Sequence, residues 1–229
     1  MNKRLKRILS YIEDGIGMID VGTDHGYLPT ELALLGYSGN ILSSDINPGP
    51  LDAARRTAKA SGVDSKIRFL LCDGLEQCPP DAIDTIVIAG MGGDTICGIL
   101  DRAEWCMDKR YKLILQPMTR AEVLRYWLVY NEFQIVHEDL VDDSGEIYQV
   151  LVARFGGATT LSDAELYTGS FEVIRYHPLF KDFLGRQIKR FERTVQGLRS
   201  ASIPDKSGKL EITETILEQL MEMKKDGNR

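Results

Sequence analysis

Long hydrophobic runs are missing from this sequence of 229 residues. No apolar segment approaches the roughly 20 residues that a membrane-spanning helix requires. The basic stretch at residues 1–7 is not followed by the hydrophobic segment of a secretory signal peptide. Hydrophobic residues make up 43% of the chain and charged residues 27%, as is usual in globular domains. We therefore expect a monomeric protein of the cytoplasm that does not enter a membrane.

Cysteine and histidine are scarce and scattered. The four cysteines, Cys72, Cys78, Cys97 and Cys106, contain no C-x-x-C pair, and the chain has only three histidines. Zinc sites require such residues at short, regular spacings. The pattern therefore argues against a metal site and predicts reduced, mostly buried thiols.

An excess of positive charge is also absent, since 28 basic residues stand against 34 acidic ones and the net charge is −6. This balance argues against a protein that binds nucleic acid without specificity. Residues 3–12, however, have the apolar spacing of a helix, and the first twelve residues contain four basic side chains and no acid. These side chains either surround a cover helix as solvated charges or face a phosphate group.

The dinucleotide-binding pattern G-x-G-x-x-G is absent from the first strand–turn–helix segment. The predicted strand 18–21 leads into a turn with Gly22 and Gly26, and a helix is predicted over residues 30–35. Glycine lets a ligand approach the backbone closely, because it has no Cβ and accepts positive φ. Where the pattern requires a second glycine, this chain has Asp24. A carboxylate at that place repels a pyrophosphate and favours a ligand with a cationic portion.

Aspartates follow the next two predicted strands. Strand 40–45 ends at Asp45, which lies 23 residues after Gly22, and strand 67–72 is followed by Asp73 and Gly74. An acid at the end of the second strand accepts hydrogen bonds from both hydroxyls of a ribose. The alternative is a helix-capping or surface aspartate. Asp73 stands where methyltransferases hold an adenine ring.

The remaining pattern completes an open sheet. Strand 83–89 opens into the glycine-rich residues 90–93, and strand 112–115 precedes a helix over residues 120–130. Segments 133–140 and 147–155 flank turn residues and predict an antiparallel hairpin. The alternation predicts an α/β fold with a seven-stranded, mostly parallel, doubly wound sheet. A closing antiparallel strand, Asp24 and the absence of a Y-x-x-x-K motif favour S-adenosylmethionine as the cofactor over a nicotinamide dinucleotide.

The C-terminal part has a different character. Gly156 and Gly157 mark a predicted boundary between a domain of residues 1–157 and one of residues 158–229. Apolar residues at helical spacing predict helices over 180–198 and 210–223, separated by residues 203–205 and Gly208, and folded back as a coiled-coil-like hairpin. Residues 178–201 carry six basic side chains against two acidic ones, which favours a polyanionic partner such as RNA. Residues 159–177 give no prediction.

Five motifs together carry a resemblance to a known family. The sequences DVGTDHGYLP, SDINP, CDGL, AGMGG and LQPM, at residues 20–29, 44–48, 72–75, 89–93 and 115–118, resemble the bacterial tRNA (adenine-N1) methyltransferases of the TrmK family. The resemblance implies a Rossmann-like fold and methyl transfer from S-adenosylmethionine to N1 of adenine 22 of tRNA. The residues assigned to the cofactor are Asp20, Gly22, His25, Gly26, Asp45, Ile46, Asp73, Gly74, Ala89 and Gly90.

The expected chemistry is undemanding, because N1 of adenine carries an in-plane lone pair and attacks without losing a proton. Positioning and charge stabilisation are then the main tasks. We assign catalytic roles to Asp24, Met91 and Gln116: Met91 shapes the base slot, and Gln116 or Asp24 hydrogen-bonds the adenine edge. Asp24 or His25 stabilises, or takes a proton from, the cationic product.

A paired adenine must leave the helix before N1 is accessible. Tyr27 is a candidate stacking platform for it, or alternatively a packing aromatic. The residues assigned to RNA binding are Lys3, Arg4, Arg7, Tyr27, Arg186, Lys189, Arg190 and Arg193. Two other functions stay open: a methyltransferase of this fold that acts on a small molecule or protein, and an RNA-binding protein without catalytic activity.

Overall fold

The computed structural model describes residues 1–200 and 208–227. The chain forms two compact units: Met1–His137 with Val141–Thr159, and Glu138–Leu140 with Thr160–Arg229. The boundary predicted after residue 157 precedes the long segment of the second unit by two residues, and the division into a methyltransferase domain and a helical domain stays a prediction. Within the described residues, no helix combines the length and apolar character needed to cross a membrane.

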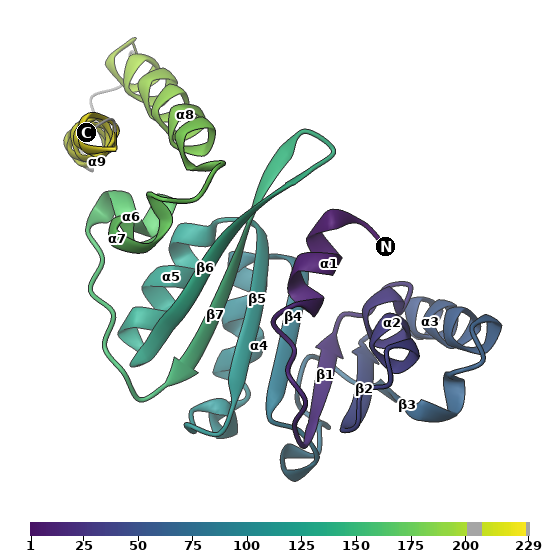
Figure 1. The fold of residues 1–229 in the computed structure, drawn as a ribbon. Coiled ribbons are helices and arrows are strands. Elements are labelled where there is room, and N and C mark those ends of the chain that lie inside the picture. The colour runs from purple at the N-terminus through teal and green to yellow at the C-terminus, as the bar shows by residue number, and fades with distance from the viewer. Residues whose placement is uncertain (201–207, 228–229) are drawn as a thin grey trace. The chain divides into compact units, whose positions relative to one another are not determined.

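A seven-stranded sheet forms the centre of the first unit (Figure 1). Its strand order is β3-β2-β1-β4-β5-β7-β6. The first five of these pair in parallel, whereas β7 is antiparallel to β5, so the predicted sheet and its closing hairpin are confirmed. The strands are β1 (Gly17–Val21), β2 (Asn40–Asp45), β3 (Ile67–Leu71), β4 (Thr85–Gly92), β5 (Lys112–Thr119), β6 (Phe133–Asp143) and β7 (Glu146–Phe155).

Helices cover both faces of the sheet, and each face has its own core (Figure 1). On one face lie α1 (Lys3–Leu9), α2 (Tyr27–Leu34) and α3 (Pro48–Ala60), and on the other α4 (Gly93–Asp101) and α5 (Ala121–Tyr130). Side chains of a strand alternate between the faces, so Ile19 enters one core and Met18 the other. This explains why the central strands read as continuous apolar runs.

The connections after β1 and β4 leave the sheet on opposite faces. Strand β1 leads to α2 and its neighbour β4 leads to α4. In an open parallel sheet such a switch creates a crevice at the carboxyl ends of the two strands, because the following helices diverge. The two glycine-rich segments, residues 22–26 and 90–93, both lie at this place.

Several element boundaries differ from the prediction. Helix α2 begins at Tyr27 and not at residue 30, because Gly26 adopts a left-handed φ of 66° and Pro29 is tolerated in a first turn. Helix α1 ends at Leu9, three residues early. Strands β4 and β5 run on to Gly92 and Thr119 through pairs with shifted register that begin after Ala89.

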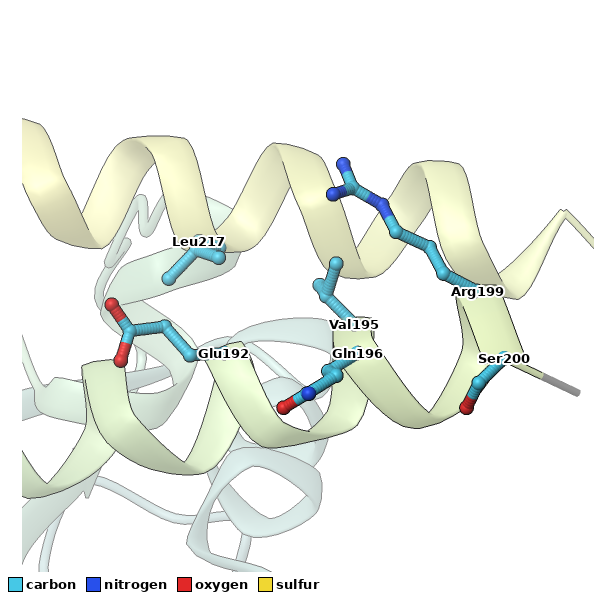
Figure 2. Close-up of a pocket in the computed structure, with 6 residues that line it drawn as sticks. All are labelled: Glu192, Val195, Gln196, Arg199, Ser200 and Leu217. Carbon is cyan, nitrogen blue, oxygen red and sulfur yellow. The ribbon is translucent and has the colours of Figure 1, made fainter.

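The second unit is helical, with α6 (Asp163–Thr168), α7 (Phe171–Ile174), α8 (Phe180–Ser200) and α9 (Lys209–Asp226). Helices α8 and α9 pack together, as predicted, and bury Phe183, Ile188, Ile216 and Leu220. Gly208 precedes α9 with a φ of 68°, whereas the break predicted at residues 203–205 lies outside the described residues. A cavity of about 450 Å³ lies between the two helices (Figure 2), and its lining residues are Glu192, Val195, Gln196, Arg199, Ser200 and Leu217.

Candidate active site

The turn after β1 is held close to two neighbouring segments. The amides of Gly22 and Thr23 both donate to the carbonyl of Ser44, at 2.8 and 3.0 Å, which ties the turn to β2. Gly22 has a φ of 75°, and a Cβ at this position would collide with the terminal methyl of Met91. The left-handed φ favours glycine at this position, and the end of the flexible Met91 side chain from β4 occupies the space beside it.

Two cavities open at the carboxyl ends of the parallel strands. The larger has a volume of about 670 Å³, within the usual range for small-molecule sites. Three acids lie in its wall, and helix α4 forms one side. Its lining residues are Val21, Gly22, Asp45, Ile46, Asn47, Cys72, Asp73, Gly74, Ala89, Gly90, Met91, Asp94, Thr95, Gly98, Ile99 and Arg102.

The smaller cavity, of about 350 Å³, lies between α1 and the turn after β1. It shares Gly22, Ala89 and Gly90 with the larger one, so backbone with little side chain forms the common wall. Its lining residues are Asn2, Arg4, Leu5, Asp20, Gly22, Thr23, Asp24, His25, Gly26, Tyr27, Leu28, Ala89 and Gly90.

The structure divides the residues that the sequence assigned to one cofactor site. Asp45, Ile46, Asp73 and Gly74 line the larger cavity, and Asp20, His25 and Gly26 line the smaller one. The three shared residues, Gly22, Ala89 and Gly90, belong to the same predicted set. The residues predicted to form one cofactor site thus lie around two adjoining cavities.

Two carboxylates of the larger cavity are oriented by hydrogen bonds. Asp45 accepts from the amide of Asn47 at 2.7 Å, and Asp73 accepts from Arg102 at 2.9 Å. In both contacts only Oδ1 is used. Oδ2 of each side chain therefore remains as an acceptor for a hydroxyl or amino group of a ligand.

Asp20 is a buried carboxyl group in the wall of the smaller cavity. Burial, with a smaller effect of the neighbouring Asp45 charge, raises its pKa from 3.8 to about 6, while an interaction with Thr23 acts in the opposite direction. Near neutral pH the folded protein therefore holds a negative charge where water cannot solvate it well. A cationic group of a ligand would compensate for this.

Gln116 is fully buried, and its amide group is engaged within the protein. Its Oε1 accepts from Arg4 at 2.5 Å and from the amide of Gly90 at 3.2 Å, and its Nε2 donates to the carbonyl of Pro117 at 2.9 Å. Arg4 also lies over the Tyr148 ring, 5.3 Å from the centroid. In this arrangement Arg4, and not Gln116, faces the smaller cavity.

Three further predicted residues meet at the smaller cavity. Asp24 Oδ2 lies 3.7 Å from His25 Nε2, and the His25 ring stacks on Tyr27 with centroids 5.4 Å apart. The side chain of Asp24 is 78% exposed, and Tyr27 is half exposed. The Tyr27 ring is thus available to a ligand on one side, whereas Met91 lies on the side of the larger cavity.

The predicted RNA-binding residues are distributed over both units. On α1, Lys3 and Arg7 are exposed. On α8 of the second unit all four predicted side chains are exposed, and Arg186 pairs with Asp182 at 2.9 Å. The four are Arg186, Lys189, Arg190 and Arg193.

Sequence reasoning missed the contribution of α4 to the larger cavity. Thr95, Gly98, Ile99 and Arg102 were not assigned, although they follow the glycine-rich segment at helical spacing. The spacing alone does not reveal which face of a helix meets a cavity. Arg102 in particular reads as an ordinary surface charge.

All four cysteines are free and buried, as predicted. Burial raises the pKa of Cys78, Cys97 and Cys106 to about 12, so these thiols are poor nucleophiles. In the part of the chain that the structure describes, no three potential ligands cluster around a metal position.

Comparison with known proteins identifies the family. Residues 1–151 match the model of a methyltransferase domain. The chain is 36% identical to the tRNA (adenine(22)-N(1))-methyltransferase of Bacillus subtilis over 156 residues, which are 68% of this chain and 66% of the relative. The crystal structure of B. subtilis m1A22 tRNA methyltransferase TrmK superimposes with a TM-score of 0.86 at 29% identity, and 98% of both chains is covered.

The chain belongs to the TrmK family of tRNA methyltransferases. A Streptococcus pneumoniae candidate tRNA (m1A22) methyltransferase has a TM-score of 0.84 at 30% identity, with 98% of this chain and 99% of that chain covered. Its complex with S-adenosyl-L-methionine has a TM-score of 0.83 at 28% identity. The family predicted from the five motifs is therefore confirmed, and the match includes the helices of the second unit.

The raised pKa of Asp20 predicts how stability depends on pH. An acid whose pKa is higher in the folded state lowers stability as pH rises from about 4 to above 6, because the unfolded chain ionises first. Two pKa units correspond to about 3 kcal/mol. Asp20→Asn should therefore stabilise the protein by about 1.5 kcal/mol at pH 5 and about 3 kcal/mol at pH 8, as measured by urea unfolding.

The matched control is Asp52→Asn, which changes an exposed carboxylate on α3. It should give no comparable gain. Equal stability of wild type and Asp20→Asn at pH 8 would show that burial does not raise the pKa of Asp20.

Proposed function

We propose that this protein transfers a methyl group from S-adenosylmethionine to N1 of adenine 22 in tRNA. The observation that carries the proposal is the pair of cavities with a common wall of Gly22, Ala89 and Gly90. A donor in one cavity and an acceptor base in the other would meet across this wall with little side chain between them. The family membership supports the same reaction.

The larger cavity suits the adenosine part of the cofactor. Asp45 at the end of β2 would accept hydrogen bonds from the ribose hydroxyls, and Asp73 after β3 from the amino group of the adenine. Asp20 lies next to the common wall and would pair with the ammonium group of the methionine part. When bound, the cofactor supplies an electrophilic methyl group on a sulfonium ion.

The smaller cavity suits the acceptor base. Tyr27 offers a half-exposed ring for stacking, Arg4 of α1 lines the same cavity, and Asp24 is an exposed acceptor that also lines it. N1 of adenine needs no general base, and the purine becomes positively charged as the methyl group arrives. The carboxylates of Asp20 and Asp24 would stabilise that charge.

Gln116 acts indirectly in this proposal. It would hold Arg4 and the backbone of Gly90 in place, while Met91 would limit the space beside the common wall. Exposed basic residues of α1 and α8 would contact tRNA phosphates. The expected monomeric state and the expected location in the cytoplasm stay predictions.

Methyl transfer to defined transcripts tests the proposal. Purified protein with S-[methyl-³H]adenosylmethionine should label a tRNA with adenine at position 22 and leave the same tRNA with guanine at that position unlabelled. Digestion of the product should yield 1-methyladenosine. Label in a metabolite pool or in protein, without label in tRNA, would favour a different methyltransferase, and tRNA retention without any transfer would favour a binding protein.

Asp45 should be required for the cofactor. Asp45→Ala removes the acceptor at the end of β2, so we expect the affinity for S-adenosylmethionine to fall at least about tenfold in calorimetry, as for a lost hydrogen bond to a charged group. Asp52→Ala, on the exposed side of α3, should bind normally. Unchanged affinity of Asp45→Ala would remove this residue from the site.

The basic side chains of α8 should determine the salt dependence of tRNA binding. Replacing Arg186, Lys189, Arg190 and Arg193 by glutamine should lower affinity and reduce the slope of log K against log salt by up to about three. Cofactor affinity should not change. Arg56→Gln with Lys59→Gln, on exposed positions of α3, is the control. An unchanged slope in the fourfold variant would mean that these charges are only solvated.

A further inference from the structure

Arg102 combines two properties: it lines the larger cavity, and it is held by three groups. Its Nη2 donates to Asp73 at 2.9 Å, its Nε to Glu76 at 3.1 Å and its Nη1 to the carbonyl of Gly98 at 2.9 Å. A planar guanidinium held at three nitrogens has little freedom to reorient. Arg102 is therefore a fixed part of the cavity wall.

These contacts join the turn after β3 to helix α4. Gly74 has a φ of 57°, and a Cβ there would lie 2.9 Å from a methyl of Ile99 on α4. The backbone beside Asp73 is thus packed closely on α4, and Arg102 directly follows the last residue of that helix. The ion pair adds a restraint on the side chain, since it engages Oδ1 of Asp73 and leaves Oδ2 to the cavity.

We infer that Arg102 is a positioning residue that fixes Asp73 for the amino group of the cofactor's adenine. The inference rests on the proposed assignment of Asp73 to that group. A carboxylate favours a purine with a 6-amino donor and disfavours a 6-oxo purine, whose oxygen is also an acceptor. By holding the carboxylate in one orientation, Arg102 sets how strongly the site distinguishes the two.

A second arginine of the same unit provides a matched control. Arg110 pairs with Asp81 at 3.1 Å, and its side chain is 44% exposed, compared with 45% for Arg102. Arg110 lies after α4, before β5, and packs on the Tyr111 ring. Replacing Arg110 removes an ion pair of similar exposure, but Arg110 is not one of the residues that line the larger cavity.

The test compares two ligands without tRNA. Calorimetry with S-adenosylhomocysteine and with S-inosylhomocysteine, which carries a 6-oxo purine, should show that wild type prefers the adenosyl compound. Arg102→Ala should lower the affinity for the adenosyl compound about tenfold and the affinity for the inosyl compound less than about twofold. The two differ because only the adenosyl compound donates a hydrogen bond from its 6-amino group to Asp73. Arg102→Lys should give an intermediate ratio, and Arg110→Ala should leave the ratio unchanged.

Other outcomes overturn the inference. Equal weakening of the binding of both ligands by Arg102→Ala would mean that Arg102 only supports α4, and unchanged affinity for both ligands would mean that it does not position Asp73. Equal affinity of the wild type for both ligands would mean that Asp73 does not bind the 6-amino group of the adenine, and that Arg102 therefore has no positioning role there. If Arg102→Ala does not fold, Arg102→Lys provides the test. The inference is then overturned if the ratio of the affinities for the two ligands is the same in Arg102→Lys as in the wild type. Because tRNA is absent, each outcome is independent of the methyl-transfer assay.

Discussion

The close approach of the turn after β1 to the end of β4 determines the geometry of the whole site. Gly22 has no side chain, and the methyl of Met91 occupies the space where one would be. On the other side of the same contact, the amide of Gly90 donates to the buried Gln116. The backbone at this place becomes the common wall of both cavities. A side chain at position 22 would be strained by the positive φ and would displace the Met91 methyl.

The sheet topology explains why the contact occurs here. Helices α2 and α4 leave β1 and β4 on opposite faces, so neither helix covers the strand ends. A ligand reaches both strand ends, while the cores on the two faces stay closed. The site therefore requires no opening of the hydrophobic core, and the flanking elements contribute through their ends: α1 through Arg4, and α4 through Arg102.

The charge on Asp20 shows that the site is not arranged for stability. A buried acid with a pKa of about 6 is costly to ionise, and replacement by asparagine would relieve that cost. Retaining the acid is explained by a cationic partner, since the proposed cofactor carries both an ammonium and a sulfonium group. The prediction from Asp24 that the ligand has a cationic portion thus has a stronger physical basis in Asp20.

Much of the first unit could be predicted because its signals are local. The strand Asn40–Asp45 was predicted with its observed bounds, since a short segment with two apolar residues ends in an acid and is soon followed by Asn47-Pro48, where a helix begins. The five motifs identified the family for the same reason, as each lies at one strand end. The short helices α6 and α7 were missed, although Ser162 and Glu165 form a capping box that marks the start of α6.

Contacts between distant segments could not be predicted. Arg4 and Gln116 are separated by 112 positions, and their hydrogen bond decides which of them faces the smaller cavity. The sequence suggested the opposite roles, with Gln116 at the base and Arg4 at a phosphate. Likewise, nothing in the sequence indicates that Arg102 meets Asp73, because the pairing depends on how closely α4 packs on the turn after β3.

The N-terminal helix shows how one cluster of charges separates into two roles. Lys3, Lys6 and Arg7 are exposed, whereas Arg4 is partly buried between Gln116 and the Tyr148 ring. A guanidinium on an aromatic face, with a short hydrogen bond to a buried amide, is held in place and cannot follow a flexible phosphate chain. Arg4 therefore belongs to the wall of the smaller cavity, whereas its neighbours Lys3, Lys6 and Arg7 present their positive charge at the surface.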